Sequence, residues 1–272
     1  MEKNMKNNES SIFYARNLSE LFYQIKTIAN LTIVGSCTAT KDLPEKMISS
    51  TLIQEFNHIG KHERYIEFGP ATTLSEIQAL GERHLPSLLL EAIDTIATPF
   101  VRNVATIGGN LMDPNNKNTL YAPLLALEAV LEFKSPTDVK YIALQNFTEI
   151  PKGHVLTNIR VPLNDWDVSI FTRLGPENRI TDTSASFAFL TDSEKSIITS
   201  IKIAFSGKIT FRCLSLENRM LGLRLPLKSK EIEAYIEDAE QEFLRAAEKT
   251  EYNPILLQQF LNLVRHSFEQ LS

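Results

Sequence analysis

The residues best suited to chemistry in this sequence are the Gly108-Gly109 pair, which precedes the last residue of the stretch TPFVRNVATIGGN, residues 98–110. Glycine has no Cβ and takes left-handed backbone angles easily, so a ligand can approach the chain closely. Backbone N–H groups in such a turn, followed by a helix N-terminus, can bind an anion. The alternative is an ordinary tight turn. Arg102 and Thr106 precede the pair in an order that a turn alone does not require, which favours a ligand-binding loop.

A second stretch of small residues follows the apolar run LTIVG, residues 31–35. The residues after this run are Ser36, Cys37, Thr38 and Ala39. Small side chains let a ligand come near the backbone, and Ser or Thr hydroxyls can donate to phosphate oxygens. A short strand-to-helix connection that merely happens to contain small residues is the other interpretation.

Hydrophobic periodicity predicts the elements that position both loops. Expected helices cover 18–30, 85–96 and 119–127, and expected strands cover 31–35 and 128–134. A strand and turn at 64–72 lead into a further helix, where Thr73 and Glu76 have the spacing of a capping box. Beyond residue 150 the pattern predicts an antiparallel meander and then two amphipathic helices. The expected strands of the meander are 153–163, 167–174, 184–190 and 196–206, and the expected helices are 228–250 and 254–271.

Composition excludes several classes of function. The 272 residues carry a formal net charge of −5, which indicates neither a nucleic-acid partner nor an anionic membrane surface. No apolar run is long enough for a transmembrane helix, and the polar N-terminus does not read as a signal peptide, so a cytoplasmic protein is expected. The two cysteines cannot form a metal site or ligate an iron–sulfur cluster. His58 and His62 lie in a glycine-containing loop and do not predict a metal site.

The string Arg102-Asn103-Val104-Ala105-Thr106-Ile107-Gly108-Gly109-Asn110 closely resembles the FAD-binding signature of the molybdenum hydroxylase flavoproteins. These are the medium subunit of carbon monoxide dehydrogenases and the middle domain of xanthine dehydrogenases. The similarity is co-linear over most of the chain. Its other matching segments are 18–40, 67–77, 85–98, 171–175 and 203–208.

The resemblance implies an α+β fold. A two-lobed FAD-binding domain of the vanillyl-alcohol-oxidase (PCMH) type is expected over 11–165, after a disordered lead-in over 1–10. Its subdomains would cover about 11–60 and 61–165. A C-terminal domain over 166–272 would hold a three-stranded antiparallel sheet backed by helices.

The resemblance also implies a site for non-covalent FAD. The pyrophosphate would lie between a first loop, residues 33–39, and a second loop, residues 106–110. The protein would supply no catalytic side chain and no metal ligand, because the flavin carries the chemistry. The implied FAD contacts are Ile33, Val34, Gly35, Ser36, Cys37, Thr38, Ala39, Thr106, Ile107, Gly108, Gly109, Asn110, Thr119, Leu156 and Thr172.

The sequence departs from the family pattern in the first loop, where Val34-Gly35-Ser36-Cys37-Thr38 replaces Ala-Gly-Gly-Thr-Asp, and at Thr119, where the family carries Asp. Two functions therefore remain open. The first is an FAD-dependent oxidoreductase subunit that takes electrons from an iron–sulfur subunit and passes them to NAD or another acceptor, with substrate oxidised on a molybdopterin subunit. The second is a family relic that folds alike, binds FAD weakly or not at all, and acts as a structural or regulatory subunit.

Overall fold

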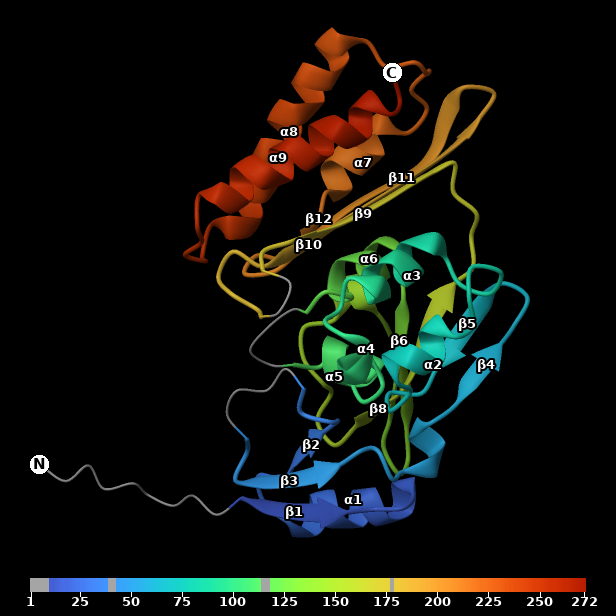
Figure 1. Cartoon of the computed structure of the whole chain (residues 1–272), viewed down its shortest axis with the longest axis vertical. Coiled ribbons are helices and arrows are strands. Elements are labelled where there is room, and N and C mark those ends of the chain that lie inside the picture. Colours follow the sequence, from blue (N-terminus) through green and yellow to red (C-terminus); the bar gives the residue numbers. More distant parts are fainter. Residues whose placement is uncertain (1–9, 39–42, 114–117, 177–178) are drawn as a thin grey trace, which may run out of the picture.

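Three sheets follow one another along the molecule (Figure 1). The computed structural model describes residues 10–38, 43–113, 118–176 and 179–272. The expected lead-in therefore lies outside the described residues, apart from Ser10, and Ala39 also lies outside them. Within these ranges no helix combines the length and the apolarity needed to cross a bilayer.

The N-terminal sheet has three parallel strands in the order β1-β3-β2, with helix α1 packed against it. Asn17 caps α1 by accepting a hydrogen bond from the Glu20 N–H, which defines where the expected helix begins. Leu21 of α1 and Ile48 of β3 are fully buried in one small core that holds the sheet and helix together. The elements are β1 Ser11–Tyr14, α1 Leu18–Thr27, β2 Thr32–Val34, β3 Lys46–Ser49 and the 3-10 helix η1 Gln54–Phe56.

The middle sheet has five antiparallel strands in the order β4-β5-β8-β6-β7, and short helices cover one face (Figure 1). The strand expected at 153–163 belongs here and not to the C-terminal meander. Ile159 and Val161 of this strand are fully buried in the core under the helices, and burial of that apolar face decides its pairing with β5 and β6. The elements are β4 Ile59–Lys61, β5 Tyr65–Phe68, α2 Leu74–Gln78, α3 Ser87–Asp94, α4 Pro99–Arg102, α5 Ile107–Leu111, α6 Tyr121–Ala126, β6 Val130–Lys134, β7 Val139–Ala143, η2 Leu144–Asn146 and β8 Val155–Pro162.

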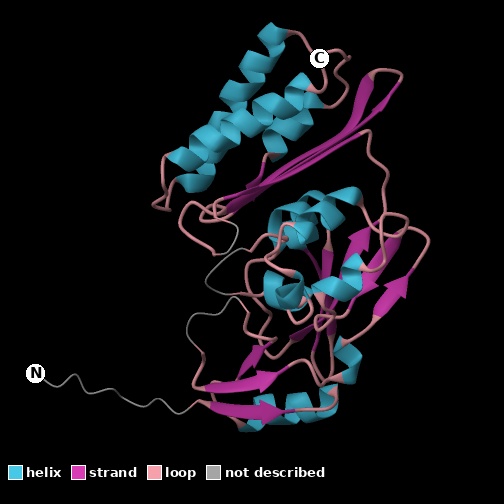
Figure 2. Ribbon diagram, viewed as in Figure 1, coloured by secondary structure: helices cyan, strands magenta, loops and turns pink. Residues whose placement is uncertain are grey.

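The C-terminal sheet lies between the middle unit and a layer of helices (Figure 2). It has four antiparallel strands in the order β12-β11-β10-β9. Three were expected, but the two-residue strand β12 pairs with β11 and is too short to show in a periodicity pattern. The elements are β9 Val168–Leu174, β10 Ala185–Glu194, β11 Ile197–Ser206, β12 Phe211–Arg212, α7 Leu214–Met220, α8 Ser229–Ala247 and α9 Ile255–Glu269.

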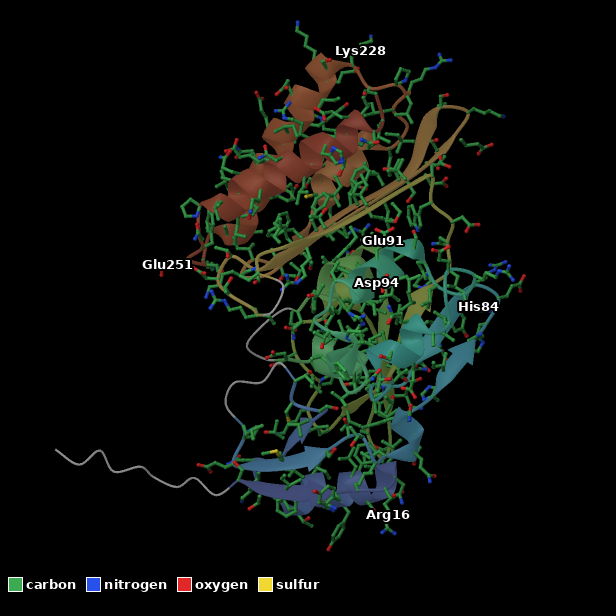
Figure 3. All side chains as sticks on the ribbon, viewed as in Figure 1. Arg16, His84, Glu91, Asp94, Lys228 and Glu251 are labelled. Carbon is green, nitrogen blue, oxygen red and sulfur yellow. The ribbon has the colours of Figure 1, made fainter. Side chains whose placement is uncertain are left out.

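Alternation along β10 explains why this sheet is apolar on both faces. Phe187 and Phe189 pack with the C-terminal helices, whereas Ala188 and Leu190 join the core of the middle unit. Lys228 and Glu251 mark the two ends of the helical layer, so α8 runs along the outer face of the sheet (Figure 3). The C-terminal unit and the middle unit thus share one continuous apolar contact.

Candidate functional site

Residues 106–110, expected to form a glycine turn, instead form the N-cap and the first residues of helix α5. Gly108 and Gly109 lie inside α5, and neither has a positive φ. Thr106 is the N-cap residue, and its Oγ1 accepts a hydrogen bond from the Gly109 N–H at 3.1 Å. Neither glycine is therefore needed for a left-handed turn.

Most backbone N–H groups of the second loop are paired within the protein, but that of Thr106 has no acceptor among the described residues. Ile107 donates to the Thr72 carbonyl at 3.1 Å, and Gly108 donates to the Pro70 carbonyl at 3.0 Å. Asn110 donates to the Thr106 carbonyl at 3.0 Å, as helix geometry requires. These bonds hold the loop next to the residues that lead into α2, so these paired N–H groups are less available to an anion than the sequence suggests.

The two glycines meet different surroundings. A Cβ on Gly108 would lie 2.6 Å from the Pro70 carbonyl oxygen and 2.6 Å from the Pro70 Cβ, which is closer than real atoms approach. A Cβ on Gly109 would meet, among the described residues, the Thr106 Oγ1 alone, at 3.0 Å. Gly108 is thus required by packing, whereas Gly109 leaves open space in front of the loop.

The capping box at the start of α2 is confirmed, and it positions the second loop. The Thr73 N–H donates to the Glu76 carboxylate at 2.8 Å, and the Glu76 N–H donates to the Thr73 hydroxyl at 3.2 Å. The Leu74 N–H then donates to the Ala105 carbonyl at 2.9 Å, and Thr73 forms an isolated β-bridge with Thr106. The cap therefore orders both the helix and the residues just ahead of the glycines.

The first loop follows directly from β2. Among the described residues, no partner accepts a hydrogen bond from the N–H of Ser36, Cys37 or Thr38. Cys37 takes a left-handed φ of 55°, which turns the chain sharply at this point. Burial raises the pKa of the Cys37 thiol, so the loop carries no negative charge there at neutral pH. Among the described residues, the first loop therefore offers three N–H groups without an acceptor, whereas in the second loop only that of Thr106 lacks one.

A cavity of about 520 Å³ lies between the two loops. A volume of this size is typical of a small-molecule or cofactor site. Among the described residues that line it there is no Lys or Arg. The expected site residues that line it are Ile33, Val34, Gly35, Ser36, Cys37, Thr38, Thr106, Gly108, Gly109, Asn110 and Leu156.

Three other expected site residues do not line this cavity, each for a structural reason. Ile107 is fully buried in the core of the middle unit. Thr172 lies opposite Phe187 in the β9–β10 pair, which places it on the sheet face that packs against the C-terminal helices. Thr119 is half-buried beside the cavity residue Asn118 but does not itself line the space.

Asn118 lines the cavity and was not among the site residues expected from the sequence. It is 4% exposed, and its Nδ2 donates to the Asn110 carbonyl at 3.3 Å and to the Asp113 carboxylate at 3.4 Å. Its Oδ1 has no hydrogen-bond partner among the described residues. A buried acceptor without a partner costs about 1–3 kcal/mol, so it marks a place where a ligand donor fits. The sequence pointed to this region only through Thr119, the next residue, where the family carries Asp.

Comparison with protein families finds a match over residues 8–164 to the FAD binding domain in molybdopterin dehydrogenase. The chain is 36% identical over 84 residues to the xanthine dehydrogenase FAD-binding subunit of Escherichia coli O157:H7. That alignment covers 30% of this chain and 28% of the subunit. It is 24% identical over 193 residues to the glyceraldehyde dehydrogenase medium chain of Sulfolobus acidocaldarius, which covers 67% of this chain and 68% of that one.

Solved structures share the fold at low identity. A chain of carbon monoxide dehydrogenase from Hydrogenophaga pseudoflava superposes with a TM-score of 0.79 at 18% identity, covering 97% of this chain and 96% of that one. A chain of quinoline 2-oxidoreductase from Pseudomonas putida 86 superposes with a TM-score of 0.76 at 13% identity, covering 96% of each. The expected α+β fold is confirmed by these similarities. With the family match over the loops and the cavity between them, the chain belongs to the family of FAD-binding domains of molybdopterin dehydrogenases.

Proposed function

We propose that this protein is the FAD-carrying electron-transfer component of a molybdenum hydroxylase. The observation that carries the proposal is the 520 Å³ cavity, which both predicted loops line and into which no described Lys or Arg projects. The family match names FAD as the ligand. The chain aligns with only 28% of its Escherichia coli relative, so the activity and partners of the whole complex belong to the proposal.

The residues around the cavity fit FAD by the chemistry of their donors. The N–H groups of Ser36, Cys37 and Thr38 have no described acceptor, and the Thr38 side chain is exposed, so the first loop can donate to the pyrophosphate. Charge-assisted hydrogen bonds of this kind contribute about 1.5–3 kcal/mol each, which compensates for the missing cations. Asn118 adds a buried acceptor for an N–H or O–H of the cofactor.

When bound, the flavin ring supplies the redox chemistry that no side chain in the cavity supplies. The chain itself binds, orients and shields the cofactor. The electrons must come from a partner, because the two cysteines cannot ligate a cluster and Cys213 is fully buried. The partners proposed are an iron–sulfur subunit and a molybdopterin subunit, with NAD or another compound as acceptor. Co-purification of the tagged chain with an iron–sulfur subunit tests this assignment.

The purified chain is expected to be yellow, or to become so on addition of FAD, and to release flavin on denaturation. Free FAD at 100 times its Kd should raise the free energy of unfolding by about 2.7 kcal/mol, because the ligand binds only the folded state. Visible absorbance and thermal melts with and without FAD measure both effects. A chain that stays colourless in excess FAD, with an unchanged melting temperature, would instead establish the relic function.

Asn118→Ala is expected to raise the Kd for FAD about 10-fold, because the buried amide no longer accepts from the cofactor. Thr119→Val is the matched control, since Thr119 is adjacent in sequence but does not line the cavity. Fluorescence titration of FAD against both variants and the wild type measures the difference. Equal losses in the two variants would contradict the placement of Asn118 at the cofactor.

A further inference from the structure

The hydroxyl of Ser36 forms a hydrogen bond within the protein and does not point into the cavity as a free donor. Its Oγ donates a hydrogen bond to the Val104 carbonyl, across 68 residues of sequence, and so joins the first loop to the segment that leads into α5. The two segments belong to neighbouring units, β2 in the N-terminal unit and α4–α5 in the middle unit (Figure 1). A side-chain hydrogen bond therefore connects the two walls of the cavity.

The same region has a second close contact between the walls. A Cβ on Gly35 would lie 2.9 Å from the Thr106 Oγ1, and 3.9 Å from the Gly109 Cα. Thr106 is itself held by the Gly109 N–H, so this contact surface is rigid on the α5 side. Gly35 allows the first loop to approach that surface, and the Ser36 bond holds it there.

We propose that Ser36 is a positioning residue that fixes the first loop against α5 and so aligns its free N–H groups for the pyrophosphate. This inference rests on the proposed FAD site and adds a residue-specific cause for its geometry. The N–H groups of Ser36, Cys37 and Thr38 have no described partner to order them. Their direction therefore depends on how the loop is anchored, and the Ser36–Val104 bond is the anchor.

This role differs from a direct phosphate contact by the Ser36 hydroxyl. A hydroxyl has one hydrogen to donate, and that hydrogen is directed to the Val104 carbonyl. A direct contact would require this bond to break on binding. The positioning role predicts instead that the loop is ordered by Ser36 before any cofactor arrives.

The experiment compares Ser36→Ala, Ser36→Thr and Ser49→Ala with the wild type in the full chain. Ser49 lies on the neighbouring strand β3, bonds to Thr51 through its hydroxyl and does not line the cavity, so it is the matched control. Backbone ¹⁵N relaxation of the chain without FAD gives order parameters for residues 34–38, and fluorescence titration gives the Kd for FAD and for riboflavin, which lacks the pyrophosphate.

Ser36→Ala is expected to lower the order parameters of the first loop from near 0.85 toward about 0.6 and to raise the Kd for FAD roughly 3- to 10-fold. The Kd for riboflavin should stay the same in Ser36→Ala. Ser36→Thr, which keeps the hydroxyl, should have the wild-type order parameters and the wild-type Kd for FAD, and so should Ser49→Ala. Weaker FAD binding with unchanged order parameters would show direct contact and overturn the positioning role. Unchanged FAD binding, or failed rescue by threonine, would overturn it too. If the wild type binds no FAD, the proposed function fails. Unchanged order parameters in Ser36→Ala would separately show that the Ser36–Val104 hydrogen bond does not order the first loop.

Discussion

Gly109→Val is expected to abolish FAD retention while the chain stays folded. Gly109 lines the cavity and faces Gly35 of the first loop: a Cβ on Gly35 would lie 3.9 Å from the Gly109 Cα. A valine side chain at position 109 would therefore occupy the space between the two loops. Among the described residues, a Cβ at this position would be crowded by the Thr106 Oγ1 alone, at 3.0 Å, which a small shift relieves. We expect the Kd for FAD to rise about 100-fold or more, which corresponds to about 2.7 kcal/mol of binding free energy. Flavin content and circular dichroism of the purified variant measure the two properties.

Gly108→Ala is the control that separates blocked binding from lost packing. Its Cβ would overlap the backbone of Pro70, so the two segments must move apart and the free energy of unfolding should fall by about 1–3 kcal/mol. A lower melting temperature in Gly108→Ala, together with a near wild-type one in Gly109→Val, is the expected pattern. Full flavin content in Gly109→Val would mean that the second loop does not approach the cofactor.

Arg212→Met is expected to be among the most destabilising single changes in the C-terminal unit. The Arg212 side chain is 6% exposed and bonds to Glu217, which is 5% exposed, at 2.7 Å. It also bonds to Glu128 at 2.8 Å and to Gln145 at 3.1 Å, both in the middle unit. Removing the guanidinium leaves the Glu217 carboxylate buried without its cation, which costs about 3–5 kcal/mol. Urea unfolding of the variant and wild type measures the loss.

The loss in Arg212→Met should grow with pH. Burial raises the pKa of the Glu217 carboxyl, and Arg212 partly offsets that rise, so removing Arg212 raises the pKa further. A carboxyl whose pKa is higher in the folded state than its unfolded value of about 4.3 stabilises the fold at low pH and loses that contribution as pH rises through the folded pKa. Unfolding at pH 5 and at pH 7.5 should therefore show the larger loss at pH 7.5.

Two further variants test whether Glu217 is the cause. Arg212→Met combined with Glu217→Gln should recover most of the stability at pH 7.5, because glutamine is neutral and can still accept the Ile203 N–H that Glu217 accepts at 2.8 Å. Glu128→Ala should cost only about 0–1 kcal/mol, since the Glu128 side chain is half exposed. No recovery in the double variant would mean that the loss comes from Arg212 packing alone.

Local features of the fold were predictable because their causes lie within a few residues of sequence. The capping box of Thr73 and Glu76 needs only a three-residue spacing, and it forms as expected. Helices α1, α3, α8 and α9 follow from apolar residues at helical spacing. The pairing of β8 was not predictable in the same way, because adjacent meander strands and separated sheet strands share the same alternation.

The sequence by itself determined the family and the two loops that line the cavity, because the composition and the order of the loops can be read without knowing which distant residues they contact. Only the tertiary structure decided which loop offers free donors. The amides of Ile107 and Gly108 bond to Thr72 and Pro70, more than thirty residues away, and that pairing depends on how the segment before α2 lies against α5. The Gly-Gly motif therefore shapes the site by packing and open space, while the less family-like first loop holds most of the N–H groups that have no acceptor among the described residues.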